Sequence, residues 1–116
     1  MNVDRAAVEG SALVDWVPEV VARIVDGVDP RLIVLFGSVA RGEDGPDSDI
    51  DLLVVLDRIE DRRHDAAVAI LRLVRGLPVA VDVFPVDQAG LEASARLPGV
   101  VRVALAEGRV VHDRAY

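Results

Sequence analysis

Two aspartates stand in a segment whose other members are strongly apolar. Asp49 and Asp51 flank Ile50, and the run Leu52-Leu53-Val54-Val55-Leu56 that follows is typical of a buried strand. Residues two apart point to the same face of a strand, which places the two carboxylates about 6 to 7 Å apart. Like charges at that distance repel each other and lose hydration, and a divalent cation between them would relieve both effects. Oxygen ligands without a nearby His or Cys favour Mg²⁺, or Mn²⁺, over zinc.

A third aspartate interrupts another apolar run. Asp82 lies within Val79-Ala80-Val81-Asp82-Val83-Phe84, and no basic residue is close to it in sequence. If the strands that carry Asp51 and Asp82 are neighbours in one sheet, the three carboxylates form a single cluster. The alternative for the Asp-x-Asp pair by itself is a strand end whose acids cap a loop or face the solvent.

The segment upstream of these acids could bind phosphate. Gly37-Ser38 follows the apolar run Arg31 to Phe36, and ten residues separate Ser38 from Asp49. A glycine at a strand exit lets backbone N–H groups approach an anion closely, and Ser38 adds a hydroxyl donor. Val39-Ala40-Arg41 could begin a helical turn whose amides attract phosphate. The simpler interpretation of Gly-Ser alone is a turn after a strand.

Strands and helices alternate around these residues. Apolar residues at helical spacing, from Leu13 to Val28, predict a helix near residues 16–27, and continuous or alternating apolar runs predict strands. The expected elements after that first helix are a strand at 31–36, a strand at 49–56, a helix at 61–75 and a strand at 79–86. The pattern predicts an α/β or α+β domain in which helices cover a central sheet.

The last third of the chain is expected to add two helices and an edge strand. Asp87 is a candidate N-cap for a short helix. Pro98 is expected to open another, ending before Gly108, with an inward face of Val100, Val101, Ala104 and Leu105. Residues 109–112 are expected to form a small edge strand.

Taken together, these residues resemble a known superfamily. The Gly37-Ser38 pair, the ten-residue spacer containing Arg41, the Ser48-Asp49-Ile50-Asp51 strand start and the later Asp82 are similar to the nucleotidyltransferases with a DNA polymerase β-type palm. The similarity is greatest to the minimal nucleotidyltransferase (MNT) antitoxins of HEPN/MNT toxin–antitoxin pairs, and it spans roughly residues 16–112. It implies the polymerase β palm-like fold, with a central mixed sheet covered by helices.

The resemblance also implies a chemistry and a role for each residue. Members transfer a nucleoside monophosphate from a nucleoside triphosphate to a hydroxyl by two-metal-ion catalysis. Asp49, Asp51 and Asp82 would be the catalytic and metal-binding residues, holding two Mg²⁺ ions, with Asp82 placed to take the acceptor proton. The residues that would bind ATP are Gly37, Ser38, Arg41 and Ser48. Arg41 could equally pair with a neighbouring acid, and Ser48 could support either the Asp49 backbone or a phosphate.

Composition narrows the set of partners. The chain has 116 residues, of which 52% are hydrophobic, and we expect one minimal domain over residues 1–116. A net charge of −7, with thirteen arginines and no lysine, disfavours binding to duplex nucleic acid. Residues 41–65 hold nine acids and four arginines, so −5 of the −7 surrounds the proposed metal site. Cysteine is absent, which excludes disulfides and thiolate metal sites.

Location and acceptor follow as expectations. No secretory signal pattern and no apolar run of about 18 residues is present, which predicts a cytoplasmic protein without a membrane segment. The length leaves no region for an added acceptor-binding domain, so the acceptor is expected on a separate protein. The resemblance implies that this partner is a cognate HEPN-family toxin, modified with AMP on a hydroxyl, that of a tyrosine. A heteromer is then expected, and a homodimer stays open.

Two other functions remain open at this point. A non-catalytic antitoxin or regulatory module could bind nucleotide and inhibit its partner sterically. An enzyme that modifies a small molecule such as an antibiotic ranks lower, because no added acceptor-binding region is evident.

Overall fold

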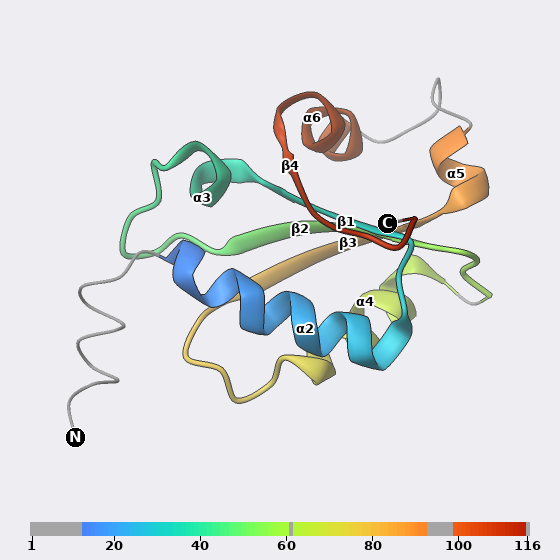
Figure 1. Cartoon of the computed structure of the whole chain (residues 1–116), viewed down its shortest axis with the longest axis horizontal. Coiled ribbons are helices and arrows are strands. Elements are labelled where there is room, and N and C mark those ends of the chain that lie inside the picture. Colours follow the sequence, from blue (N-terminus) through green and yellow to red (C-terminus); the bar gives the residue numbers. More distant parts are fainter. Residues whose placement is uncertain (1–12, 61, 93–98, 116) are drawn as a thin grey trace.

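A four-stranded mixed sheet with helices on both faces forms the protein (Figure 1). The computed structural model describes residues 13–60, 62–92 and 99–115. The strands are β1 (Leu32–Phe36), β2 (Ile50–Leu56), β3 (Val81–Asp87) and β4 (Arg109–Asp113), in the order β3-β2-β1-β4. β2 and β3 are parallel, whereas β1 is antiparallel to both β2 and β4. The expected mixed sheet is therefore confirmed.

The helices divide between the two faces of this sheet. The chain begins with a short 3₁₀ helix, η1 (Leu13–Trp16), which leads into α2 (Val17–Val28). Helices α2 and α4 (Arg63–Leu73) cover one face, while α5 (Gln88–Glu92) and α6 (Gly99–Glu107) lie on the other (Figure 1). The short helix α3 (Gly37–Arg41) follows β1 directly, and its buried Val39 packs in the core on the α2 side. Within the described residues, no helix is long and apolar enough to cross a membrane.

Residue alternation along β2 assigns each side chain to one of two cores. Ile50, Leu52 and Val54 pack in the core that contains the buried residues of α2 and α4. Leu53 and Val55 pack in the core that contains Val101 and Ala104 of α6. Because successive side chains of a strand point to opposite faces, the side chain of residue 51 lies on the α6 side of the sheet.

Several predicted boundaries shift by one or two residues. The first helix continues past Gly27 to Val28, and Asp29 ends it with φ of 47°. Gly27 is therefore not the helix end; it allows close packing, because a Cβ atom at this position would meet Leu73 of α4. β2 begins at Ile50, one residue after Asp49. The helix predicted at 61–75 spans Arg63–Leu73, with residue 61 outside the described residues, and the strand predicted at 79–86 spans Val81–Asp87.

One predicted core residue of α6 is wrong. Val101 and Ala104 are buried as expected, but Leu105 is 45% exposed. A position one residue beyond Ala104 is turned by about 100° around the helix axis, and α6 buries only a narrow stripe against the sheet. Pro98 and the side chain of Val100 lie outside the described residues. The N-cap prediction is confirmed, since the Gly90 N–H donates to Asp87 Oδ1 over 2.7 Å.

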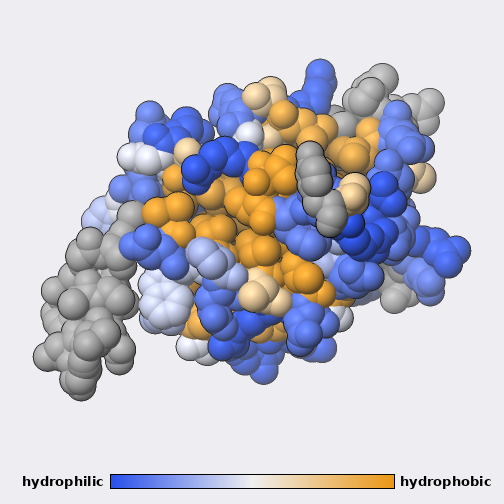
Figure 2. Space-filling view, in the orientation of Figure 1, coloured by the Kyte–Doolittle hydropathy of each residue, from blue (hydrophilic) through white to orange (hydrophobic). Residues whose placement is uncertain are grey.

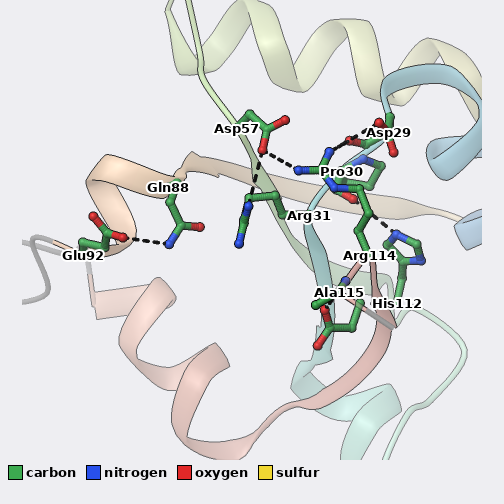
Figure 3. A network of polar contacts seen from close by, with 10 residues as sticks. Asp29, Pro30, Arg31, Asp57, Gln88, Glu92, His112, Arg114 and Ala115 are labelled. Carbon is green, nitrogen blue, oxygen red and sulfur yellow. Dashed lines mark hydrogen bonds and ion pairs between the residues drawn. The ribbon is translucent and has the colours of Figure 1, made fainter.

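β4 forms an edge of the sheet as predicted, and apolar side chains reach the surface around it. Figure 2 shows hydrophobic surface over α6 and β4. The exposed large hydrophobic residues among those that the structure describes are Val103 and Leu105 of α6 and Val110 of β4. Arg114 follows β4 and binds two acids from other parts of the chain (Figure 3). Its guanidinium donates to Asp57 Oδ1 over 2.6 Å and to Asp29 Oδ2 over 3.3 Å. These contacts tie β4 to the far end of β2.

Candidate active site

The two strand aspartates lie side by side in the sheet. Asp51 of β2 is in register with Asp82 of the parallel strand β3, and with Phe36 of β1 on its other side. Neighbouring strands are about 4.8 Å apart, so the two side chains leave the α6 face as adjacent groups. Asp49 lies two residues before Asp51, at the entrance to the strand. The condition set by the sequence, that the strands of Asp51 and Asp82 be neighbours, is confirmed.

Burial and the closeness of the carboxylates raise the pKa of two of them. Partial burial is the main reason that the pKa of Asp51 is raised, and repulsion from Asp82 and Asp49 raises it further. Attraction to the Arg41 guanidinium offsets part of that rise. The pKa of Asp82 is also raised, first by burial and then by the Asp49 carboxylate, through repulsion and a hydrogen bond. Each shift would be relieved by a cation placed among the three acids.

Gly37 is required at its position for two independent reasons. It is the first residue of α3 and has φ of 79°, in the left-handed region that residues with a side chain rarely adopt. A Cβ atom at this position would also collide with a carboxylate oxygen of Asp51. The backbone at the end of β1 therefore lies directly beside the Asp51 carboxylate, and the absence of a side chain at position 37 makes this close approach possible.

Ser38 and Ser48 meet across the loop that separates them in sequence. Their hydroxyl oxygens are 3.2 Å apart and hydrogen-bonded. The Gly45 N–H donates to Ser48 Oγ over 2.8 Å. Both residues are only partly buried, so the two serines predicted to bind phosphate remain accessible to a ligand.

Arg41 pairs with acids, as one of the two interpretations of the sequence held. Its Nε donates to Glu43 Oε1 over 2.9 Å, and its Nη1 lies 3.6 Å from Glu107 Oε1 at the end of α6. The hydrogen bond to Glu43 is the main reason that its pKa is raised, and Asp51 contributes as well. Arg41 is exposed, so these ion pairs are weak and a stronger anion could compete for the guanidinium.

The carboxylate oxygens fit a hard divalent cation by type. Among the described residues, no three His, Cys, Asp or Glu side chains are already gathered as a group that could hold a metal ion. The fit therefore rests on the type of donor and on the uncompensated charge.

A hollow of about 770 Å³ adjoins the acids on the side of the loop and η1. Its walls combine loop residues before β2 with the segment before β3 and one residue of η1, namely Leu13, Asp44, Gly45, Pro46, Asp47, Ser48, Asp49, Pro78, Val79 and Ala80. Asp49 and Ser48 belong to both this hollow and the site, whereas Asp51 and Asp82 face the other side of the sheet.

Two contributors to the site were missed from the sequence. Glu107 contacts Arg41 although 66 residues separate them, and nothing in the local pattern indicates that pairing. Gly45 supplies the N–H that Ser48 accepts. The sequence Gly45-Pro46-Asp47-Ser48 is typical of a tight turn, which could have pointed to this contact.

The fold, the paired aspartates and the glycine beside them define a nucleotidyltransferase domain. The family model described as "Nucleotidyltransferase domain" matches residues 15–111, and the chain belongs to this family. No protein with a curated description matches the chain.

Solved structures share the fold. A putative nucleotidyltransferase from Sulfolobus solfataricus is similar with a TM-score of 0.63 and 24% identity, covering 89% of this chain and 82% of that one. A mutant of the toxin–antitoxin MntA-HpeT is similar with a TM-score of 0.60 and 20% identity, covering 83% and 72%. A toxin–antitoxin with AMP-PNP gives a TM-score of 0.57 and 22% identity, covering 82% and 72%.

Proposed function

We propose that this chain is an antitoxin that transfers AMP from ATP to a hydroxyl group, on a tyrosine, of a HEPN-family toxin. The observation that carries the catalytic part is the register of Asp51 with Asp82 beside Gly37. The partner part is supported by similarity to the toxin–antitoxin structures, one of which holds AMP-PNP. A single domain in the cytoplasm, where ATP is abundant, is part of the same proposal.

The three aspartates hold the metal in this proposal. Two Mg²⁺ ions bound there would stabilise both the entering and the leaving oxygen during displacement at the α-phosphate. Asp49 and Asp51, on one strand, contribute carboxylate oxygens from one side. Asp82 is the more exposed acid and lies on the neighbouring strand, which supports a role for it beside an acceptor that arrives from the solvent.

The exit of β1 holds the leaving group. Gly37 leaves backbone open beside Asp51, and Ser38 presents a hydroxyl at the start of α3. The Arg41 guanidinium, held by two exposed ion pairs, can exchange Glu43 or Glu107 for a phosphate oxygen. Ser48 supports Ser38 from the loop.

The reaction balances with the residues named. The oxygen of the acceptor hydroxyl forms a bond to the α-phosphorus of ATP, while the bond from that phosphorus to the bridging oxygen of the β-phosphate breaks. The hydroxyl proton passes to the Asp82 carboxylate, and pyrophosphate leaves with the bonding electrons.

The test is a transfer assay with the product of the neighbouring gene as acceptor. The protein is incubated with ATP labelled at the α-phosphate, Mg²⁺ and that product, and label on the acceptor is measured after separation. Asp82→Ala and Asp49→Ala should abolish labelling. Asp26→Asn, at an exposed acid on α2, is the matched control and should keep it.

The steric alternative makes a different prediction in the same experiment. If the wild-type protein and Asp49→Ala both inhibit the partner and neither labels it, inhibition is steric and the catalytic proposal fails. If a parallel incubation with an antibiotic in place of the gene product labels the antibiotic, and the gene product itself stays unlabelled, the acceptor is a small molecule.

A further inference from the structure

The loop between α3 and β2 is tied back on the phosphate side of the site at two points. Ser38 accepts the Glu43 N–H at its carbonyl oxygen over 2.8 Å, and its hydroxyl meets Ser48 Oγ at 3.2 Å. The first contact fixes the start of the loop and the second fixes its end. Ser38 is therefore joined to the residue directly before Asp49.

The end of the loop is itself a closed turn. The Ser48 N–H donates to the Gly45 carbonyl over 3.1 Å, while the Gly45 N–H donates to Ser48 Oγ over 2.8 Å. Pro46, at the second position of this four-residue turn, restricts the backbone to the conformation that the turn needs. Ser48 Oγ thus has one lone pair occupied by a rigid backbone donor.

We propose that Ser48 is a positioning residue that aims the Ser38 hydroxyl proton at a phosphate oxygen. A hydroxyl has one proton and two lone pairs, and either of two facing hydroxyls can be the donor. When an anion competes for the proton of Ser38, Ser48 becomes the donor to Ser38 Oγ, while it keeps the Gly45 N–H as its own donor. The chain of bonds then runs from Gly45 N–H through Ser48 and Ser38 to the anion.

This chain has an energetic consequence. Each bond polarises the next in the same direction, so Ser38 donates more strongly than an isolated serine would. Without Ser48, the Ser38 hydroxyl can rotate freely and loses its preferred donor. The inference rests on the proposed function, because it assumes that the anion is the triphosphate of a nucleotide.

A double-mutant cycle tests the inference. Affinity for AMP-PNP with Mg²⁺ is measured by calorimetry for wild type, Ser38→Ala, Ser48→Ala and the double variant. Loss of one such hydrogen bond weakens binding by about threefold to tenfold. We expect Ser48→Ala to lose less affinity than Ser38→Ala, because the Ser38 hydroxyl is still present, and we expect the double variant to lose no more than Ser38→Ala alone. Wild-type affinity in Ser48→Ala, or losses that multiply, would overturn the inference.

Two further measurements separate aiming from mere loop support. In the transfer assay, Ser48→Ala should raise KM for ATP and leave kcat nearly unchanged, while Ser48→Thr, which keeps the hydroxyl, should restore KM. A fall in kcat with unchanged KM would mean that Ser48 acts on Asp49 instead.

The last measurement needs no nucleotide. Hydrogen exchange at the Gly45 amide should quicken in Ser48→Ala and stay slow in Ser48→Thr, and equal rates in all three proteins would contradict the link. If the wild-type protein binds no nucleotide at all, the proposed function fails. The exchange rate of the Gly45 amide in the three proteins then still shows whether Ser48 stabilises the turn.

Discussion

β2 carries acids at both ends, and their surroundings are opposite. Asp57 follows the end of the strand and accepts a hydrogen bond from Arg114 Nη2 over 2.6 Å, with Arg31 Nη1 at 3.8 Å (Figure 3). The Arg114 hydrogen bond lowers the pKa of Asp57. Asp51, at the start of the strand, faces two other acids, and its pKa is raised by burial and their repulsion.

The chain provides a counter-charge for the acid at the Asp57 end of β2 more fully than for the acids at the Asp51 end. At the Asp57 end, two arginines from distant segments satisfy the carboxylate, so this acid joins β4 and the loop after α2 to the sheet. At the Asp51 end, the exposed Arg41 compensates only part of three carboxylates. Uncompensated charge in a partly buried position lowers stability, and such positions are typical of sites that bind a ligand.

The largest expected effect separates the two ends by activity. Asp51→Asn removes an oxygen that we propose binds the metal, and it should lower the proposed AMP transfer at least about a hundredfold, since even indirect supports of metal sites contribute 10–100-fold. Asp57→Asn removes a carboxylate of the same strand outside the site and should keep transfer within about twofold of wild type. Comparable loss in both variants would mean that the site is sensitive to the integrity of β2 rather than to the Asp51 carboxylate.

The second effect concerns the glycine that borders the acid end. Gly37→Ala and Gly42→Ala both place a side chain at positive φ, 79° and 73° respectively, but only position 37 lies against Asp51, while nothing lies within 4 Å of a Cβ at position 42. Gly42→Ala should cost about 1 kcal/mol of unfolding free energy from backbone conformation alone. Gly37→Ala should cost roughly twice that, because the methyl group must also displace the carboxylate.

Urea denaturation of the two glycine variants provides the measurement. Equal losses at the two positions would show that backbone conformation, and not the approach to Asp51, requires glycine at position 37.

The third effect is the response to metal. Mg²⁺ at ten times its dissociation constant stabilises the folded state by about 1.4 kcal/mol, which corresponds to a rise in Tm of several degrees for a protein of this size. Thermal unfolding should show this rise for wild type and Asp57→Asn, and Asp51→Asn should lose most of it. A rise of the same size in Asp51→Asn would place the ion elsewhere.

Much of this site could be predicted because its signals are local. Asp49, Asp51 and Asp82 stand out against apolar strands, and Gly37-Ser38 follows a buried strand directly. Whether Asp82 would reach Asp51 depended on strand order, which periodicity does not encode, because residues that pair across a sheet share no pattern in sequence. The parallel pairing of β2 with β3 therefore had to come from the structure.

The partners of the arginines could not be predicted for the same reason. Arg114 binds Asp29 and Asp57 over separations of 85 and 57 residues. Leu105 failed as a core residue because its helix buries only one narrow stripe, and the width of that stripe depends on what lies beneath the helix. Local sequence predicts which face is apolar, and tertiary packing decides how much of it is covered.

The smallest expected effect is on Tm, and it should have opposite signs for the acids at the two ends of β2. A carboxylate whose pKa is raised by folding, such as Asp51, favours the folded state when protonated, and this stability is lost as the pH rises through the raised pKa. Asp57 has a lowered pKa, so its contribution is present above the ordinary carboxylate range and is lost as the pH falls through the lowered value. Without Mg²⁺ at pH 7, Asp51→Asn should therefore raise Tm and Asp57→Asn should lower it.

The Asp51→Asn difference should shrink toward zero as the pH falls through the raised pKa of Asp51 to the ordinary carboxylate range, whereas the Asp57→Asn difference should shrink only below that range, as the pH falls through the lowered pKa of Asp57. For Asp51, which is partly exposed, screening by solvent limits the change to roughly one or two degrees. Thermal unfolding in chelator-containing buffer from pH 7 to pH 3 measures it. A lower Tm for Asp51→Asn at pH 7 would show that the chain already supplies this acid with a counter-charge, and the contrast between the two ends of β2 would then fail.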